Sequence, residues 1–406
     1  MAMASGAVTP LKTTCVVVGG GPAGMMAGLL LARAGVAVTV LEKHADFLRD
    51  FRGDTVHPST MQVLHELGLL ERFLQRPHSR ISRIGGSFGN ETLELADFRS
   101  LKCQAPFIAM MPQWDFLDFL ADEAREFPAF SLLMQTQATG LIETDGRVNG
   151  VRAQSPDGKV DIVADLVIGA DGRHSILREA AGLYTTDIGV SIDVLWFRVS
   201  RDAASGDERL FRAAAGLALV TINRNEYWQC AYIVPKGGAD EVREKGIEAF
   251  RRNVATAAPD LAGAVGEIAS FDDVKLLTVK IDRLQKWWKS GLLMIGDAAH
   301  AMSPVGGVGI NIAIQDAVAA VRMLRDKLKS GTLVDEDLAA VQKRRLWPVK
   351  ATQFMQMMAQ NRIVSPIIGG TAPRPPLPLR LVARSAFLKR RFAALIGIGA
   401  RPEHVD

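Results

Sequence analysis

A glycine-rich turn directly after an apolar run constrains this chain more than any other feature. Residues 15–18 (Cys-Val-Val-Val) predict a buried parallel strand. Residues 19–24 (Gly-Gly-Gly-Pro-Ala-Gly) match the spacing GxGxxG, and a helix is predicted over residues 23–34. A second strand is predicted over residues 36–41. This strand–helix–strand order predicts a dinucleotide-binding unit at the start of an α/β fold.

Each glycine of the GxGxxG spacing has its own physical purpose. Gly19 permits the tight turn, Gly21 lets the backbone approach a pyrophosphate, and Gly24 lets the helix pack on the strand. Glu42 ends the second strand, where a carboxylate can accept hydrogen bonds from a ribose diol. The spacing alone does not separate FAD from NAD. The other candidates for nucleotide contact in this unit are Pro22, Ala23 and Lys43.

Two further strand–glycine segments lie far along the chain. Residues 165–175 carry a strand followed by Asp171, which could also be a plain Asp-Gly turn. Residues 292–311 carry a strand followed by Asp297, then a glycine-rich turn and a helix from Asn311. A carboxylate at a strand tip can bind ribose or ribityl hydroxyls, and a helix N-terminus stabilises the negative charge of a reduced flavin. We therefore expect the three segments to converge on one flavin.

In this order and spacing, the three segments resemble the FAD-binding, DG and GD motifs of the p-hydroxybenzoate hydroxylase-type FAD-dependent monooxygenases. The resemblance covers roughly residues 14–358. It implies that Arg52 and Gln113 touch the sugar–phosphate region of FAD and that the backbone at Ala138 meets the adenine. It implies that Asp171 serves both FAD and NAD(P)H and that Asp297 binds the ribityl–pyrophosphate region. Beside Asp297 and along the isoalloxazine it places Gly296, Pro304, Gly307, Val308, Gly309, Ile310 and Asn311.

The fold that the resemblance implies is α/β. A glutathione-reductase-type, Rossmann-like FAD-binding domain is interleaved with a substrate domain made of a β-sheet and helices, and a helical C-terminal segment follows. The β-rich runs between the motifs independently favour this interleaving. The expected FAD-binding domain spans residues 11–75, 106–183 and 280–360. The expected substrate-binding domain spans residues 76–105 and 184–279, and the basic C-terminal segment spans residues 361–406.

The activity that the resemblance implies is that of a single-component hydroxylase. NAD(P)H would reduce FAD as a transient co-substrate, since the chain has no second GxGxxG unit. The reduced flavin would react with O2 to give a C4a-hydroperoxide that hydroxylates a small aromatic or otherwise electron-rich molecule. Two alternatives stay open: a flavin-dependent reductase of a C=C bond without oxygen insertion, and a membrane-recruited flavoprotein. A halogenase is disfavoured because no WxWxIP motif occurs.

Candidate substrate residues lie on the β-rich runs between residues 192 and 235. Alternation along a strand puts Trp196 and Arg198 on one face. An arginine there would suit a phenolate or carboxylate, although it could equally point to solvent. The further candidates, from neighbouring runs and from the third motif, are Asn223, Tyr232 and Pro304.

Two histidines fall near the expected flavin. His57, at the start of a predicted helix, is the tentative catalytic residue, although a lone histidine is usually structural. His300 lies inside the third motif, where we expect its ring to hydrogen-bond the backbone. No cluster of His, Cys, Asp and Glu has metal-ligand spacing, so no metal is expected.

The stretch from Leu338 to Pro402 contains no Asp or Glu but many Lys and Arg, interspersed with Leu and Phe. We favour a basic helix that covers an acidic or apolar side of its own protein or of a second copy, over a contact with a membrane surface or an acidic partner. The net charge of +4 does not indicate nucleic acid. Three widely spaced cysteines and an N-terminus without signal-peptide features favour a cytoplasmic monomer or homodimer.

Overall fold

Strand β1 (Leu11–Val18) is the centre of an eight-stranded sheet. It pairs in parallel with β2 (Val38–Leu41) on one side and with β11 (Gly158–Gly169) on the other. The parallel order continues to β8 (Phe130–Leu133) beyond β2 and to β20 (Leu292–Met294) beyond β11. The last four residues of β1 and of β11 and the whole of β2 are buried, as parallel strands covered by helices must be. The carboxyl ends of β1, β11 and β20 therefore meet at one edge.

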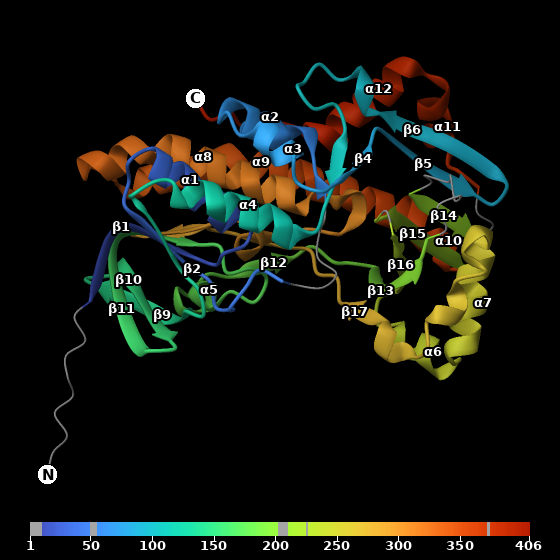
Figure 1. Ribbon diagram of the computed structural model, residues 1–406, viewed down its shortest axis with the longest axis horizontal. Helices are drawn as coiled ribbons and strands as arrows, with labels where there is room; N and C mark the ends of the chain where they lie inside the picture. The colour runs from blue at the N-terminus through green and yellow to red at the C-terminus, as the bar shows by residue number, and fades with distance from the viewer. Residues whose placement is uncertain (1–9, 49–54, 202–209, 225, 372–373) are drawn as a thin grey trace, which may run out of the picture.

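Antiparallel strands and helices complete this first lobe. Strands β9 (Gln137–Thr144) and β10 (Arg147–Ser155) form a ribbon on β11, and β19 (Trp288–Lys289) pairs with β20. Helices cross the sheet on the side that is uppermost in Figure 1. Their apolar faces share one buried core with the strands. They are α1 (Pro22–Arg33), α4 (Gln113–Arg125) and α8 (Gly309–Ser330).

A seven-stranded sheet forms the second lobe, with strand order β17-β13-β16-β15-β14-β5-β6. Helices α6 (Ala239–Glu244) and α7 (Ile247–Ala257) cover one of its faces. The strands come from two separated stretches of the chain: β5 (Arg83–Phe88), β6 (Glu91–Asp97), β13 (Ile192–Ser200), β14 (Phe211–Ala214), β15 (Leu217–Asn223), β16 (Tyr227–Pro235) and β17 (Lys275–Leu277).

Two small three-stranded sheets, of order β3-β7-β4 and β12-β18-β21, lie beside the large ones. Their strands are β3 (Thr55–Val56), β4 (Ser79–Ile81), β7 (Ile108–Met110), β12 (Thr185–Asp187), β18 (Asp282–Leu284) and β21 (His300–Ala301). Short helices follow the strands: α2 (Pro58–Glu66), α3 (Leu70–Leu74) and α5 (Ile176–Ala180).

The C-terminal part runs across both lobes. Helix α9 (Asp335–Ala359) packs on α8 and ends in a π-helical turn (Gln360–Val364) that leads into α10 (Ser365–Ile368). Helices α11 (Leu377–Arg384) and α12 (Ala386–Gly397) pack on β6, and the chain then returns to the first lobe (Figure 1). The preferred interpretation of the basic stretch agrees with this arrangement, because α11 and α12 cover part of their own protein.

The structure is a computed structural model that describes residues 10–48, 55–201, 210–224, 226–371 and 374–406. Helices α6 and α7 are two short helices and not one continuous helix. Gly246 separates them with a left-handed φ of +82°, which other residues adopt only with strain. Helix α11 begins at Leu377, within the proline-rich piece of residues 373–378. By length and hydropathy, Val305–Ser330 could span a membrane, but 67% of that window is buried in the protein core.

Candidate functional site

The first two glycine turns touch each other at the carboxyl ends of β1 and β11. Ala170 N–H donates to the Val18 carbonyl at 2.8 Å, which continues the parallel pairing of the two strands. Gly19 has a φ of +109°, and a Cβ built on it would lie 2.3 Å from the Ala170 carbonyl oxygen. Only glycine permits this approach. Two segments about 150 residues apart in sequence are thus in van der Waals contact, as the sequence predicts.

The third glycine turn joins the first two. Gly296 follows β20, and a Cβ built on it would lie 3.2 Å from the Cβ atoms of both Ala23 and Ala313. The turn therefore fits between the start of α1 and the start of α8. Arg173, in the second segment, and Asp297, in the third, form an ion pair with Nε and Oδ2 3.0 Å apart. Their side chains are about one-third exposed, 32% and 33%, so a ligand can still reach both.

The N-terminus of α1 has the geometry of a pyrophosphate site. A Cβ on Gly24 would lie 1.9 Å from the Gly19 carbonyl oxygen, so the helix packs directly on the turn. At Gly21, by contrast, a Cβ would meet no described atom within 4 Å. The predicted division of labour is visible here: Gly24 is needed inside the protein, whereas Gly21 leaves space outside it. Pro22 and Ala23 form the first turn of the helix, whose free N–H groups and positive pole face that space.

Glu42 is held at the end of β2 by the backbone of the first turn. Its Oε2 accepts Gly20 N–H at 3.1 Å, and its Oε1 accepts His44 N–H at 3.0 Å. A carboxylate has about four lone-pair sites, so these bonds orient it and leave acceptor capacity for a ribose diol. Lys43 is exposed beside it.

The glycine-rich turn before α8 is anchored to β3. Thr55 Oγ1 donates to the Gly307 carbonyl at 2.6 Å. A Cβ on Gly307 would lie 2.7 Å from Thr55 Oγ1. Gly306 and Gly307 have φ values of +83° and +63°. Pro304, Val308, Gly309 and Ile310 are all half-buried around this turn. The first N–H groups of α8 thus follow a loop with few side chains, which leaves room for a flat ring.

The side chain of Asn311 points into the protein and not toward the position expected for the isoalloxazine. The Oδ1 atom accepts His57 N–H at 3.0 Å and Thr60 Oγ1–H at 2.7 Å, and Nδ2 donates to the Thr55 carbonyl at 3.3 Å. The side chain is 5% exposed. It ties α8 to the start of α2, so only the backbone of Asn311 belongs to the helix terminus at the site.

His57 lies in the protein interior. The side chain is fully buried, and Nδ1 lies 2.9 Å from the Ile396 carbonyl oxygen at the end of α12. Burial lowers the pKa of His57 to about 4, against the opposing effect of that hydrogen bond. The ring therefore connects α2 to the C-terminal helix, and the structure assigns it a packing role instead of the tentative catalytic role.

The DG-segment aspartate caps a helix. Asp171 Oδ2 accepts Leu177 N–H at 3.2 Å near the start of α5. Burial raises the pKa of Asp171, although hydrogen bonds from Ser175 and from the backbone oppose this. Its position beside Gly19 keeps it at the edge of the site, and its side chain is directed toward α5.

The remaining predicted cofactor residues occupy scattered positions. Gln113 is half-buried at the first position of α4, after Pro112. Ala138 is buried in β9, opposite Ala153 of β10. Arg52 lies outside the described residues.

Three glutamines on α9 and its π-helical turn hold the third motif in place, and the sequence analysis missed them. Gln353 Nε2 donates to the Ala301 carbonyl at 3.1 Å. Gln356 Oε1 accepts Ser303 N–H at 3.1 Å, and Gln356 Nε2 donates to the Ser303 carbonyl at 2.8 Å. Gln360 Nε2 donates to Ser303 Oγ at 2.6 Å. Their spacing of i, i+3 and i+7 on one helix face was the signal that could have revealed them.

A buried charge network supports the same motif from behind. Asp316 Oδ2 accepts Gly296 N–H at 3.1 Å and lies 2.5 Å from His300 Nε2, and its Oδ1 accepts Arg345 Nε at 2.9 Å. Burial opposes ionisation of Asp316, but the charges and hydrogen bonds of His300 and Arg345 lower its pKa overall. The expectation that His300 bonds the backbone is wrong, because its partner is a carboxylate.

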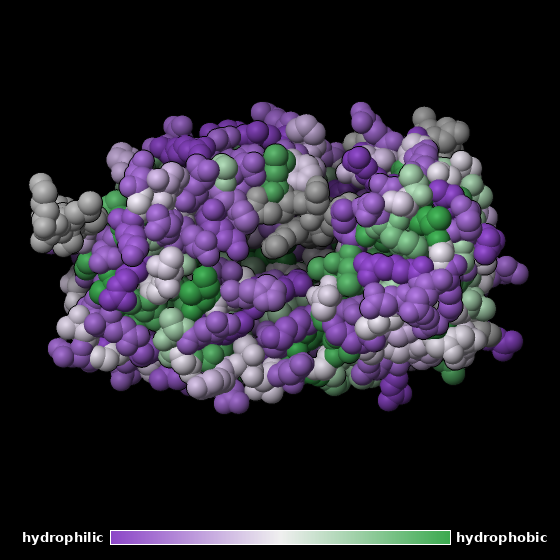
Figure 2. Space-filling view, turned by 90° about the horizontal axis from the view of Figure 1, so that it is seen from below, coloured by the Kyte–Doolittle hydropathy of each residue, from purple (hydrophilic) through white to green (hydrophobic). Residues whose placement is uncertain are grey.

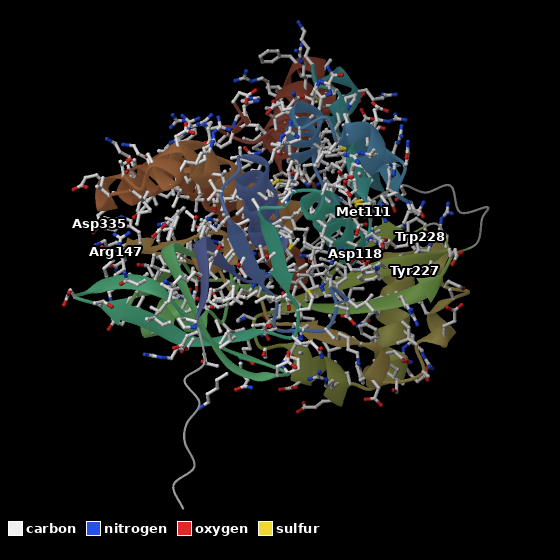
Figure 3. The ribbon with its side chains drawn as sticks, turned by 60° about the vertical axis from the view of Figure 1, so that its left-hand side comes forward. Met111, Asp118, Arg147, Tyr227, Trp228 and Asp335 are labelled. Atoms are coloured by element: carbon white, nitrogen blue, oxygen red, sulfur yellow. The ribbon has the colours of Figure 1, made fainter. Side chains whose placement is uncertain are left out.

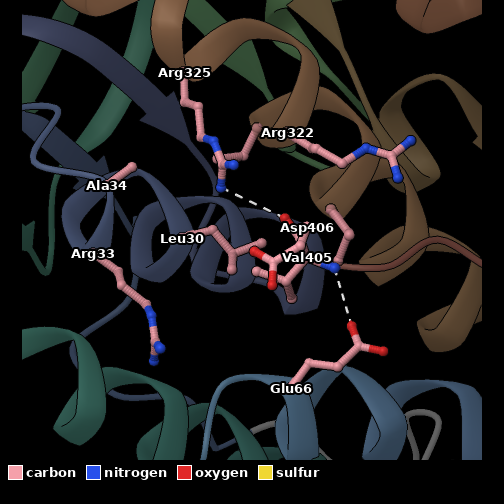
Figure 4. Close-up of a pocket in the computed structure, with 10 residues that line it drawn as sticks. Leu30, Arg33, Ala34, Glu66, Arg322, Arg325, Val405 and Asp406 are labelled. Atoms are coloured by element: carbon pink, nitrogen blue, oxygen red, sulfur yellow. Dashed lines mark hydrogen bonds between the residues drawn. The ribbon is translucent and has the colours of Figure 1, made fainter.

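Glu403 extends this network to the C-terminal residues. It is 1% exposed, and its carboxylate pairs with Arg344 at 2.8 Å, Arg322 at 3.0 Å and Arg345 at 3.3 Å. Beyond it, Val405 N–H donates to Glu66 at 3.0 Å and the Val405 carbonyl accepts Arg325 at 3.5 Å (Figure 4). The acid-free stretch is thus followed directly by a buried carboxylate that pairs with two of its arginines, Arg344 and Arg345.

The predicted substrate residues lie on two different faces of the seven-stranded sheet. Trp196 and Arg198 share the face that packs with Val305 of the third glycine turn, named here the turn-side face. Tyr232 lies on the opposite, helix-side face, where Asn253 of α7 donates to its hydroxyl at 3.3 Å. The pairing register puts Asn223 opposite Trp228 on that same helix-side face. The structure therefore brings only Trp196, Arg198 and Pro304 toward the site.

A recess separates the two lobes on the side seen from below (Figure 2). Figure 3 shows how far apart the ends of the molecule lie, with Arg147 in the first sheet and Tyr227 and Trp228 in the second. Val305 of the third glycine turn packs against side chains of the second sheet. Within the described ranges, no group of three His, Cys, Asp or Glu side chains is placed to hold a metal ion.

These observations fit FAD as a resident group. Space beside Gly21, two helix N-termini and the accessible Asp297 carboxylate provide for an extended dinucleotide with a second ring system. The fold and the site together define an α/β flavoprotein. The family model described as FAD binding domain matches residues 12–354, so the chain belongs to this family. The match supports the resemblance to the p-hydroxybenzoate hydroxylase-type monooxygenases.

Known proteins agree with this assignment. The chain is 34% identical over 375 residues to 6-methylpretetramide 4-monooxygenase of Streptomyces rimosus, over 92% of this chain and 89% of the relative. It is 27% identical to pentachlorophenol 4-monooxygenase of Sphingobium chlorophenolicum, over 74% of this chain but 56% of that longer relative. PqsL, a probable FAD-dependent monooxygenase from Pseudomonas aeruginosa, shares the fold with a TM-score of 0.75 at 20% identity, over 87% of this chain and 97% of PqsL. The chain is an FAD-dependent monooxygenase, for which NAD(P)H is the family's usual reductant.

Proposed function

We propose that this enzyme hydroxylates a polycyclic phenol, of the pretetramide or tetracycline kind, with NAD(P)H and O2. The observation that carries the proposal is the relative with the greatest identity among those described above. That relative acts on 6-methylpretetramide, by its name, and it aligns with almost the whole of this chain. The turn-side face supports the proposal because its composition suits a flat apolar molecule.

The turn-side face is wide and apolar. By register, Trp196 lies opposite Ala231, which lies opposite Val220 on the next strand. Ile222 and Ile233 continue the same face along the sheet. Side chains of this kind give little hydrogen bonding and a large area for contact with fused rings.

One end of the turn-side face is polar. Arg198 lies opposite Gln229, whose Oε1 accepts Arg224 Nε at 2.9 Å. Arg198 is exposed and Gln229 is 5% exposed, so the polar end faces solvent at its rim. A guanidinium at that position would attract a phenolate oxygen and would set which edge of the ring system enters first.

When bound, FAD supplies the redox chemistry: it accepts a hydride from NAD(P)H and activates O2 for transfer of one oxygen atom. The chain contributes position and electrostatics. The loop from Gly306 to Gly309 carries only one side chain, that of Val308, and the positive end of α8 would stabilise negative charge beside it. The turn-side face excludes water from the reacting edge of the substrate, and this limits unproductive release of peroxide.

Substrate-dependent oxygen transfer is the direct test. The FAD-loaded enzyme would be given NAD(P)H, 18O2 and a set of phenols with one to four fused rings, including anhydrotetracycline. We expect NAD(P)H oxidation to be stimulated most by the polycyclic phenols, with one 18O atom in the product and little peroxide. Stimulation by single-ring phenols alone, or peroxide formed in amounts equal to the NAD(P)H consumed with every compound, would contradict the proposal.

A further inference from the structure

Helices α11 and α12 expose large apolar side chains on their outer surface. Leu377 is 73% exposed, Leu381 is 61% exposed and Phe387 is 68% exposed. Leu377, Leu381 and Arg384 follow one another at helical spacing on one side of α11. In an amphipathic helix that only covered its own protein, these positions would be polar. The outward face of α11–α12 is therefore apolar where solvent would favour polar residues.

The cations of α11 and α12 divide into two sets. Arg380 and Lys389 point to the protein and pair with Glu91 at 2.7 Å and Glu94 at 3.0 Å, both on β6. These pairs fasten the two helices to the second lobe. The outward set, Arg384, Arg390 and Arg391, is exposed and makes no ion pair with another part of the chain that the structure describes.

A groove connects the outward cations with the apolar residues. It has a volume of about 440 Å³ and lies between α12 and the segment that follows β6. Its walls combine cations with apolar side chains: Lys102, Arg390 and Arg391 with Leu101, Phe387 and Ile398. This combination matches an amphiphile that has an anionic head and a hydrocarbon chain.

We propose that the outward face of α11–α12 binds the surface of a bilayer that contains anionic phospholipids. Phe387, Leu377 and Leu381 enter the boundary between headgroups and acyl chains, and the outward arginines contact lipid phosphates. Charge complementarity selects this occupant, since the stretch from Leu338 to Pro402 has no carboxylate of its own. A second copy docked by two-fold symmetry would place the same arginines against each other.

The position of α11–α12 permits the enzyme to act while bound to a bilayer. Both helices lie at the top of Figure 1, whereas the recess between the lobes is on the face seen from below in Figure 2. Contact with a membrane through α11–α12 would leave the recess open. The proposal concerns location and is independent of which aromatic compound is hydroxylated.

Vesicle flotation with the FAD-loaded full chain tests the proposal. Neutral phosphatidylcholine vesicles would be compared with vesicles that contain about 30 mol% phosphatidylglycerol. We expect at least about tenfold more protein on the anionic vesicles, and loss of this excess at about 0.5 M salt. The variant R384Q/R390Q/R391Q should lose about tenfold in binding, and L381S/F387S several-fold.

The matched control is W347S/F354S on α9, where the two side chains are 58% and 65% exposed on a different helix. It should bind vesicles as the wild type does. Flavin absorbance confirms that each variant is folded and loaded. Equal binding to neutral and anionic vesicles, binding unchanged in the arginine variant, or binding lost equally in W347S/F354S would overturn the proposal. A wild-type dimer in light scattering that becomes monomeric in R384Q/R390Q/R391Q would assign the face to a second copy instead.

Discussion

The glycine turns of the first lobe and the turn-side face of the second lobe tolerate change very differently. At the turns, backbone atoms approach so closely that one methyl group would collide: a Cβ on Gly24 lies 1.9 Å from a carbonyl oxygen. On the turn-side face, side chains such as Trp196 and Val220 are half-buried against other apolar side chains and can be exchanged at moderate cost. The comparison teaches that the glycine turns are constrained by backbone contacts, whereas the turn-side face is built from side chains that can diverge within one fold.

The largest effect should come from placing a methyl group inside the first turn. Gly24→Ala forces α1 away from Gly19, so we expect loss of FAD and a fall in the free energy of unfolding of about 3 kcal/mol. Gly21→Ala is the matched change, because its methyl group would meet only the ligand. It should unfold like the wild type in urea yet bind FAD at least about tenfold more weakly. If both variants lost stability equally, the space beside Gly21 would not be a ligand site.

Removing the Glu403 carboxylate, which extends the charge network behind the third turn, should have the next largest effect. Glu403→Ala leaves the buried Arg345 without one of its two carboxylates, so we expect the free energy of unfolding to fall by about 3 kcal/mol. Glu403→Gln keeps the shape and should lie between Ala and the wild type. Urea denaturation measures both. A change within about 0.5 kcal/mol for the alanine variant would show that solvent replaces the pairing at Arg322 and Arg344.

The pH dependence of stability should report on His57. Its pKa is lowered from 6.5 to about 4 by burial, so the unfolded chain takes up the proton first as the pH falls. Stability is therefore complete above pH 6.5 and is lost between pH 6.5 and about 4, by at most about 3 kcal/mol. In His57→Asn the amide N–H can still donate to the Ile396 carbonyl, but the titration is gone. A melting temperature that falls with the same slope in both proteins would remove His57 from this account.

The smallest effects should separate the two faces of the seven-stranded sheet. Trp196→Ala, on the turn-side face, should raise KM for the best aromatic substrate about tenfold and increase peroxide release. Tyr232→Phe, on the helix-side face, removes one hydrogen bond to Asn253 and should leave KM unchanged. Steady-state kinetics with peroxide measurement tests both. Equal changes in KM in Trp196→Ala and Tyr232→Phe would mean that substrate contacts are not confined to the turn-side face.

The sequence predicted that the three glycine turns converge, because the signals that mark each turn are local. Gly19, Gly21 and Gly24 are close in sequence and need no partner to be recognised, and the order of strands then brings Ala170 and Gly296 to them. The class of enzyme followed from the same motifs, and the comparisons confirm it.

What the sequence did not predict depends on contacts between distant residues. The sequence of β16 alone does not show which face of the sheet carries Tyr232, and that face can be assigned only once β16 is paired with β13. The network of Asp316, Arg345 and Glu403 joins two helices and the C-terminal residues, and nothing local marks it. Only the glutamines of α9 had a readable helical spacing.

Titration of the flavin-free protein with FAD tests the central claim most directly, namely that three distant turns form one cofactor site. The account predicts one FAD per chain, bound at least about tenfold more weakly by Asp297→Ala, whose carboxylate belongs to the third turn. Gly21→Ala in the first turn should weaken the same binding event. Unchanged affinity in Asp297→Ala, or affinity lost through only one of the two turns, would contradict the account.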